Sequence, residues 1–381
     1  MKRKLFVVAV VGLVIFTWAH NSSAAEPIRI GSLPPLSGTD AYAGIAQKQT
    51  YEMMAAKLNN AGGINGRPIK IIYYDVELKP DIAVSMAKRL IEKDQVTAIL
   101  GPPHSITGLA TVSSIEKAEI PTFLLGSSDL IDHPVKKWIF KVVPHSGVGV
   151  NKLLGYMKSQ GIQRIALMTS QDAYGDDGRR YYIEGAPKYG IKIVFEDKYT
   201  MQDMDVSPIL NKIKRTDAQA VANYSPYRAP IMFTMTYRRM GIELPLFMSP
   251  GDLSHFFLET AGKAAEGVIL PSYKFFGTKD LLDSDPQKKV ILDYMAMYKE
   301  KYGKEAEHFG GTAYDAFTIL IAALKKAGDD KSKLRDAIEQ TRGFVGAMGI
   351  FDYSPTVHGC MSENSFAVYK VVGGDFKLIT Y

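Results

Sequence analysis

The stretch that decides the fold class is residues 96–118, V-T-A-I-L-G-P-P-H-S-I-T-G-L-A-T-V-S-S-I-E-K-A. Residues 96–100 are a short apolar run, which is typical of a strand buried on both faces. A loop with one glycine and two prolines follows, and residues 106–118 have the apolar spacing of a helix. A buried strand that leads into a helix predicts a βαβ unit, and therefore a parallel sheet covered by helices.

The same alternation extends in both directions from this stretch. We predict strands at 28–33, 69–74, 121–125, 165–169, 192–196, 218–223, 246–248, 267–271, 366–372 and 376–381. We predict helices at 40–60, 82–92, 177–189, 206–215, 231–240, 287–302, 312–327 and 331–339. The alternation of strands and helices begins again after residue 140, and no Pro/Ser-rich linker separates the two parts. We therefore expect two α/β lobes with a ligand cleft between them.

The N-terminus has the pattern of an export leader. Three basic residues at positions 2–4 precede an apolar run at 5–19, and Ser22-Ser23-Ala24-Ala25 supplies small residues for cleavage. The apolar run is shorter than the roughly 20 residues that span a bilayer. We predict a cleaved signal peptide at 1–25, a periplasmic location, and no lipid anchor because no cysteine follows the run.

Composition excludes several classes of protein. The 381 residues carry a formal charge of +6, and the leader accounts for half of it, which is too little to suggest nucleic-acid binding. One cysteine, Cys360, excludes an intrachain disulfide and any site with several cysteine ligands. We find no nucleophile elbow, P-loop, dinucleotide fingerprint or paired metal-binding histidines. We therefore expect no enzyme activity, no metal and no cofactor.

Polar loops follow two neighbouring predicted strands. Ser105 opens the helix after the strand at 96–100, and Gly126-Ser127-Ser128 follows the strand at 121–125. Ser105 alone is equally well explained as a helix cap or as an anion ligand. Because two such loops from adjacent strands converge at one edge of a sheet, the pair favours a site for a carboxylate or another anion.

Six short motifs in matching order resemble a known family across essentially the whole chain after the leader. They are I-R-I-G (28–31) with P-L-S-G (35–38), N-N-A-G-G-I-N-G (59–66), G-P (101–102), D-A-Y-G (172–175), A-A-E-G-V (264–268) and Y-D-A (314–316). The chain is thus similar to the periplasmic solute-binding proteins of the branched-chain amino-acid (Leu/Ile/Val) type, which have the type I periplasmic-binding fold.

The resemblance implies a receptor that closes two Rossmann-like lobes on a solute and delivers it to the permease subunits of an ABC transporter. Three hinge crossings would place 26–145 with 274–354 in one lobe, and 146–273 with 355–381 in the other. We expect a monomer whose partners are a small carboxylate and the permease. A sensory module of the same fold is the alternative.

The family's ligand contacts transfer to this sequence residue by residue. The serine that holds the ligand carboxylate matches Ser105, and the next loop matches Gly126 and Ser128. The tyrosine of the second lobe matches Tyr174, and an aromatic wall residue matches Phe309. Tyr42 stands one position from the expected aromatic, so it is either a contact or a packed surface tyrosine.

Departures from the family pattern concern the ligand amine. Gly251 stands where the family has the glutamate that pairs with an ammonium, and Ser146 replaces an aspartate. Asp252 either substitutes for the glutamate, which would allow an amino-acid ligand, or caps the next helix, which we favour. The family's disulfide is also missing, since its positions are Glu77 and His104.

An ammonium buried without a carboxylate partner costs several kcal/mol. We therefore expect a carboxylate ligand without an α-amino group, such as an aromatic acid or a 2-oxo acid. His104 or Arg228 would bind a second polar group of it. The side chains considered for its far end are Tyr224, Tyr227, Arg228, His255, Phe256 and Tyr273.

Overall fold

The computed structural model describes residues 26–38, 40–200, 203, 205–226, 228–359 and 363–380. The predicted leader at 1–25, Tyr227 and Cys360 lie outside the described residues. None of the described helices has the length and apolar character needed to cross a membrane.

Residues 28–140 build a parallel sheet with strand order β2-β1-β3-β4-β5. Its strands are β1 (Ile28–Ser32), β2 (Ile69–Tyr73), β3 (Ala98–Leu100), β4 (Thr122–Phe123) and β5 (Ile139–Phe140). The helices between them are α1 (Ala41–Asn60), α2 (Pro80–Glu92), α3 (Ser105–Ala118) and the 3-10 turn η1 (Asp129–Ile131). Gly62 and Gly63, both at positive φ, follow α1 and turn the chain toward β2.

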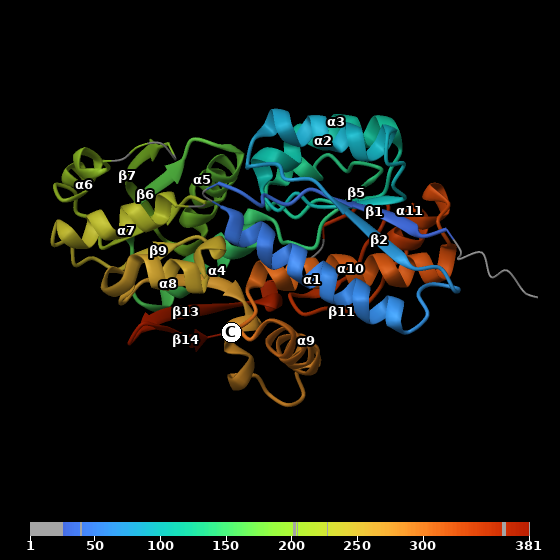
Figure 1. The fold of residues 1–381 in the computed structure, drawn as a ribbon. Coiled ribbons are helices and arrows are strands. Elements are labelled where there is room, and N and C mark those ends of the chain that lie inside the picture. The colour runs from blue at the N-terminus through green and yellow to red at the C-terminus, as the bar shows by residue number, and fades with distance from the viewer. Residues whose placement is uncertain are drawn as a thin grey trace, which may run out of the picture.

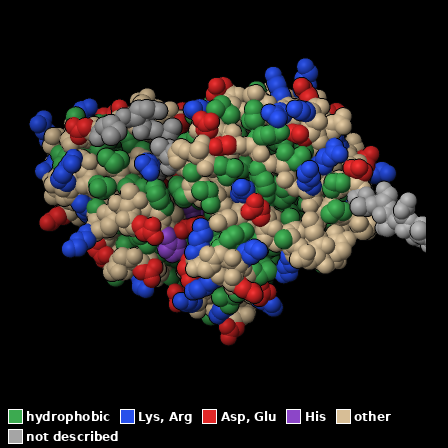
Figure 2. Space-filling view, viewed as in Figure 1, with side chains coloured by type: hydrophobic (Ala, Val, Ile, Leu, Met, Phe, Trp, Pro, Cys, Tyr) green, Lys and Arg blue, Asp and Glu red, His purple; other side chains and the backbone are tan. Residues whose placement is uncertain are grey.

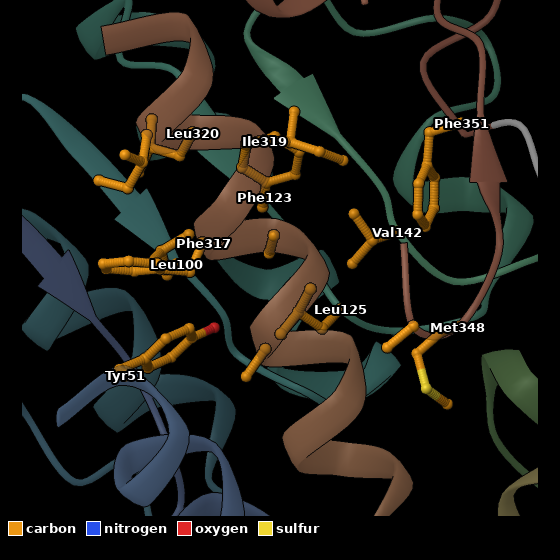
Figure 3. Close-up of a cluster of buried hydrophobic side chains, with 14 of the residues drawn as sticks. Tyr51, Leu100, Phe123, Leu125, Val142, Phe317, Ile319, Leu320, Met348 and Phe351 are labelled. Carbon is orange, nitrogen blue, oxygen red and sulfur yellow. The ribbon is translucent and has the colours of Figure 1, made fainter. Parts of the chain in front are cut away.

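Late helices return to pack on this first sheet. They are α9 (Pro286–Tyr302), α10 (His308–Ala327) and α11 (Lys331–Glu339), followed by the small hairpin β11 (Phe344–Val345) and β12 (Ile350–Phe351). Figure 3 shows Phe317 and Leu320 of α10 among side chains of the first sheet such as Leu100. Burial of apolar side chains thus holds α10 against the first sheet, although the two are far apart in the sequence.

The second sheet has strand order β14-β13-β10-β9-β8-β6-β7. Its strands are β6 (Arg164–Ser170), β7 (Lys192–Tyr199), β8 (Ala220–Tyr224), β9 (Leu246–Met248), β10 (Ile269–Tyr273), β13 (Phe366–Val372) and β14 (Asp375–Thr380). The helices and 3-10 turns of this part are α4 (Ser146–Ser159), α5 (Ala173–Gly185), η2 (Ala186–Tyr189), α6 (Ser207–Ile213), α7 (Ala229–Arg239), η3 (Pro250–Asp252), α8 (His255–Ala261), η4 (Gly262–Ala265), η5 (Lys274–Asp280) and η6 (Glu363–Ser365).

The expectation of parallel sheets holds for the first sheet and for β6–β10. The last two strands are different, because β13 and β14 add to the edge in antiparallel orientation. In the described part of the chain, the path passes from the first sheet to the second after β5, back to the first after β10, and to the second again at β13. Figure 1 shows the two sheets side by side, each with its own helices.

Several predicted elements need correction. The helix predicted at 177–189 begins at Ala173 and ends in the 3-10 turn η2, and the helix predicted at 312–327 begins four residues earlier, at His308. The strand predicted at 121–125 is only Thr122–Phe123. The prediction omitted α4, α8 and β5 altogether. Figure 2 shows acidic and basic side chains intermixed over the face in view, as the small net charge suggests.

Candidate functional site

A pocket lies between the two sheets, at the carboxyl ends of strands from both. The side toward the first sheet is lined by Asp40, Tyr42, Pro103, His104, Ser105, Leu125, Ser127, His308, Phe309 and Thr312. The rest of the lining is Val143, Pro144, His145, Ser146, Tyr174, Tyr224, Pro226, Pro250, Gly251, Tyr273 and Phe366.

Ser105, the first residue of α3, lies in this pocket. Its Oγ accepts a hydrogen bond of 3.0 Å from the backbone N–H of Ser128. A Cβ on Gly126 would lie 2.7 Å from the Cα and backbone N of Ser105, so the two loops meet with no space for a side chain there. The first N–H groups of a helix have no partner inside the helix and attract anions. The hydroxyl and the helix start together therefore suit a carboxylate.

Ser128 supports this arrangement from behind the pocket, which it does not line. It is fully buried, and its Oγ donates a 2.7 Å hydrogen bond to Oδ2 of Asp177 in α5, on the side of the second sheet. The backbone N–H of Asp129 donates to the same carboxylate oxygen at 3.0 Å. The loop that orients Ser105 is thus also a contact between the two halves of the molecule.

Aromatic rings form one wall of the pocket. Tyr42 of α1 stacks on Phe256 of α8 with 4.5 Å between ring centroids, and it meets Phe309 of α10 edge to face at 5.6 Å. Tyr42 and Phe309 line the pocket, whereas Phe256 is outside its lining. Because α1 and α10 pack on the first sheet and α8 belongs with the second, the stacked pair joins the two sides.

Tyrosines line the opposite side. Tyr174 of α5 and Tyr224 of β8 stack with centroids 4.6 Å apart, and Tyr273 ends β10. Burial raises the pKa of all three phenols well above the ordinary value, so each hydroxyl keeps its proton. These hydroxyls can donate to a polar group or accept from one at the far end of a ligand.

Asp252 does not line the pocket. It is buried in η3, where its Oδ2 accepts the backbone N–H of Ser249 at 3.1 Å and the Ser249 hydroxyl at 2.8 Å. This is a capping box, in which residue 252 satisfies the start of its own short helix. Gly251 does line the pocket and presents no side chain to it.

Two further candidates contact neighbours outside the pocket lining. Arg228 is exposed, with its guanidinium 5.7 Å from the centroid of the Phe256 ring. The Nδ1 of His255 lies 2.8 Å from Oε1 of Glu307, the residue before α10. That hydrogen bond raises the pKa of His255 above its ordinary value.

Asp40 is a pocket residue that the sequence reasoning did not identify. It precedes α1 and is only 1 % exposed, yet its side chain makes no capping hydrogen bond to that helix. Its Oδ2 contacts Nε2 of His104, which is also buried. An aspartate before a helix is normally a cap, so the sequence offered no signal that this carboxyl points elsewhere.

A second polar cluster lies beside the pocket, around His145, the residue before α4. The carboxylate of Asp129 lies 2.9 Å from Nδ1 of His145 and 2.5 Å from both Arg180 and the Tyr181 hydroxyl. Although burial opposes ionisation, the hydrogen bonds with His145 and Tyr181 keep the pKa of Asp129 well below its ordinary value. Ligand atoms of Asp132, His133 and His145 also lie within 4.8 Å of one another, a grouping that could hold a metal and that sequence spacing did not reveal. Lys141 already pairs with Asp132 at 3.2 Å.

Comparison with protein families and curated proteins identifies related sequences. A family model described as periplasmic binding protein matches residues 27–375. The leucine-, isoleucine-, valine-, threonine- and alanine-binding protein of Pseudomonas aeruginosa is 24% identical over 337 residues, 86% of each chain. The Leu/Ile/Val-binding protein of Escherichia coli K12 is 24% identical over 314 residues, 81% of this chain and 82% of that protein.

Solved structures share the fold over most of the chain. An extracellular ligand-binding receptor from Rhodopseudomonas palustris HaA2 superposes with a TM-score of 0.87 at 23% identity, covering 93% of this chain and 99% of the other. A branched-chain amino-acid transporter substrate-binding protein from Streptococcus pneumoniae, solved with isoleucine, gives a TM-score of 0.83 at 21% identity, covering 93% and 100%.

Proposed function

The chain belongs to the periplasmic binding protein family, of the branched-chain amino-acid transporter type, and on this premise we propose that it is a receptor whose pocket closes on a small carboxylate. The family consists of solute-binding proteins, so binding without chemical turnover is its activity. The proposed role is delivery of the solute to the permease of an ABC transporter, from a periplasmic location.

The observation that carries the proposal is the hydrogen bond from the Ser128 N–H to Ser105 Oγ. Because Oγ accepts this bond, the hydroxyl hydrogen of Ser105 can be donated to a solute carboxylate. The adjacent N-terminus of α3 adds partial positive charge at the same point. A charge-assisted hydrogen bond of this kind is roughly twice as strong as a neutral one.

We propose that the solute lacks an α-amino group. Gly251 contributes no carboxylate to the pocket, and both hydrogen bonds to Oδ2 of Asp252 come from Ser249. The aromatic wall of Tyr42 and Phe309 suits an aromatic or apolar body, and the tyrosine hydroxyls suit a polar far end. An aromatic acid or a 2-oxo acid has this combination of groups.

An amino acid is the second candidate, and one observation favours it. Asp40 places a buried carboxyl in the pocket, which offers an ammonium partner other than Asp252. The related proteins named above are described as binding amino acids, which also supports this alternative.

We further propose that the lobes are residues 26–145 with 274–354, and 146–273 with 355–381. Support comes from the packing of α10 on the first sheet and from the pairing of β13 with β10 in the second. Closure would bring together the two partners of each contact that spans the pocket, such as Tyr42 with Phe256.

A thermal-shift screen tests the proposal, because a ligand that binds the native state raises its apparent stability. Leucine, isoleucine and phenylalanine would be compared with benzoate, phenylpyruvate and 2-oxoisocaproate. We expect the acids without an amine to stabilise the protein and calorimetry to confirm binding. Stabilisation by leucine but by none of these acids would overturn the proposed solute class. No response to any carboxylate would overturn the proposed function.

A further inference from the structure

The buried carboxyl of Asp40 lines the pocket and lies against a histidine ring. Neither of its oxygens accepts a hydrogen bond from a backbone N–H of the described residues, and its Oδ2 lies against Nε2 of His104. The loops that follow β1 and β3 bring the two side chains together, and both are nine-tenths or more buried. Burying an ionised carboxylate without such bonds is costly unless a proton or a cation accompanies it.

His104 also connects this pair to the proposed carboxylate site. It is the residue immediately before Ser105, and its ring meets Phe309 edge to face at 5.9 Å. Asp40, His104 and Ser105 all line the same pocket, so a solute carboxylate bound to Ser105 would lie close to the pair of Asp40 and His104.

We propose that Asp40 and His104 form a second subsite of the pocket, which holds one shared proton beside an anionic solute, so that binding of such a solute from neutral solution takes up a proton. This inference rests on the proposed function, because it assumes a carboxylate solute at Ser105. The proton shared by Asp40 and His104 would compensate the negative charge of the solute.

The sign of the effect follows from electrostatics. Burial raises the pKa of Asp40 to about 7, opposed by Arg228 and Tyr42, while burial lowers the pKa of His104 to about 3. The pair therefore exchanges a single proton near neutrality, between a net charge of zero and of minus one. A nearby anion disfavours the negative form and raises the affinity for the proton, whereas an ammonium does the reverse.

Other titratable groups face the same space and must be separated from Asp40. Burial lowers the pKa of His308 to about 3 and raises that of the three tyrosines, so these groups do not titrate near neutrality. His145 lines the pocket as well, and His255 pairs with Glu307 beside Phe256. The experiment therefore assigns the proton by substitution.

Asp40→Asn keeps the size of the side chain and removes the titration. Calorimetry of benzoate and phenylpyruvate in phosphate and in Tris, which differ in ionisation enthalpy, gives the number of protons exchanged on binding. The matched controls are His255→Gln and His145→Gln. For the wild type we expect proton uptake and an affinity that falls by up to about tenfold per unit between about pH 7 and about pH 8.

In Asp40→Asn we expect most of the proton uptake to be lost. His255→Gln should remove at most the small part of the uptake that accompanies closure, and His145→Gln should leave the uptake in place. Binding of the acids with uptake unchanged in Asp40→Asn would overturn the subsite and leave the proposed function intact. Proton release on binding leucine, lost in Asp40→Asn, would overturn both the subsite and the amine-free solute, because Asp40 would then pair with the ammonium.

If none of these probes binds, the subsite can still be tested without solute. The raised pKa of Asp40 means that the folded protein binds this proton more tightly than the unfolded chain. The free energy of unfolding should therefore fall more steeply between about pH 5 and about pH 8 in the wild type than in Asp40→Asn. Equal slopes would overturn the shared proton.

Discussion

The hydroxyl oxygen of Ser105 accepts the backbone N–H of Ser128 at 3.0 Å, and this bond links the pocket to the contact between the two halves of the molecule. Ser128 is held in turn by Asp177 of α5. Gly126 packs directly on the backbone of Ser105, so the two loops stay in contact while the Ser128 N–H holds the hydroxyl. Such preorganisation reduces the entropy lost on binding.

Replacing Ser105 with alanine should weaken solute binding by about 1.5–3 kcal/mol, since the lost hydrogen bond is to a charged group. Calorimetry would record this as an affinity about 10- to 100-fold lower. Ser113→Ala is the matched control, because Ser113 is exposed on the same helix. Equal affinities for the wild type and Ser105→Ala would remove Ser105 from the site.

Phe256→Ala should weaken binding although Phe256 does not line the pocket. Its stacking on Tyr42 joins the two sides, and an aromatic pair contributes about 0.5–1.5 kcal/mol beyond its buried area. We expect a loss of about two- to tenfold in affinity, measured by calorimetry.

Leu258→Ala controls for loss of packing, because Leu258 is half-buried on the same helix and packs against the core of the second sheet. It should lower the melting temperature without changing affinity. The explanation by closure fails if Leu258→Ala weakens binding as much as Phe256→Ala does.

The pair of His255 and Glu307 should make closure depend on pH. Its hydrogen bond raises the pKa of His255, so its contribution is complete below the ordinary pKa of about 6.5 and is lost as pH rises through the raised value. The effect should be small, because the His255 side chain is 40% exposed.

We would measure affinity against pH in an Asp40→Asn background, which removes the other titration proposed in the pocket. His255→Gln and Glu307→Gln should each flatten the remaining decline in affinity above neutrality. A decline that persists in both variants would mean that the pair does not contribute to closure.

The sequence predicts the alternation of strands and helices well because buried strands and amphipathic helices carry their own periodicity. It fails at α4, in which Gly147, Gly149 and Gly155 weaken the helical pattern. A Cβ at Gly147 would lie 2.5 Å from the Tyr181 ring, and one at Gly149 would lie 2.5 Å from Pro250. Close packing with distant segments therefore requires these glycines, and no local pattern encodes it.

Within the site, too, local sequence patterns could be predicted, whereas contacts between distant segments could not. Ser105 follows a recognisable strand and starts a helix, so topology alone places it at the sheet edge. Asp40 has the sequence context of a cap, and only the fold brings His104 against it. His133 and His145 are likewise adjacent only in space, with ring centroids 4.6 Å apart.

Asp315, from the late motif Y-D-A, should govern stability rather than binding. Its fully buried carboxyl accepts the backbone N–H groups of Ala347 at 2.6 Å and Met348 at 2.8 Å, fastening α10 to the loop between β11 and β12. Asp315→Ala would leave two buried donors without partners, at about 1–3 kcal/mol each. We expect urea unfolding to show a loss of about 2–4 kcal/mol in the free energy of unfolding, whereas the exposed control Asp280→Ala should change it little.

Solute affinity of Asp315→Ala should stay unchanged below the melting transition, since Asp315 does not line the pocket. An unfolding free energy equal to that of the wild type would show that the loop satisfies these donors in another way.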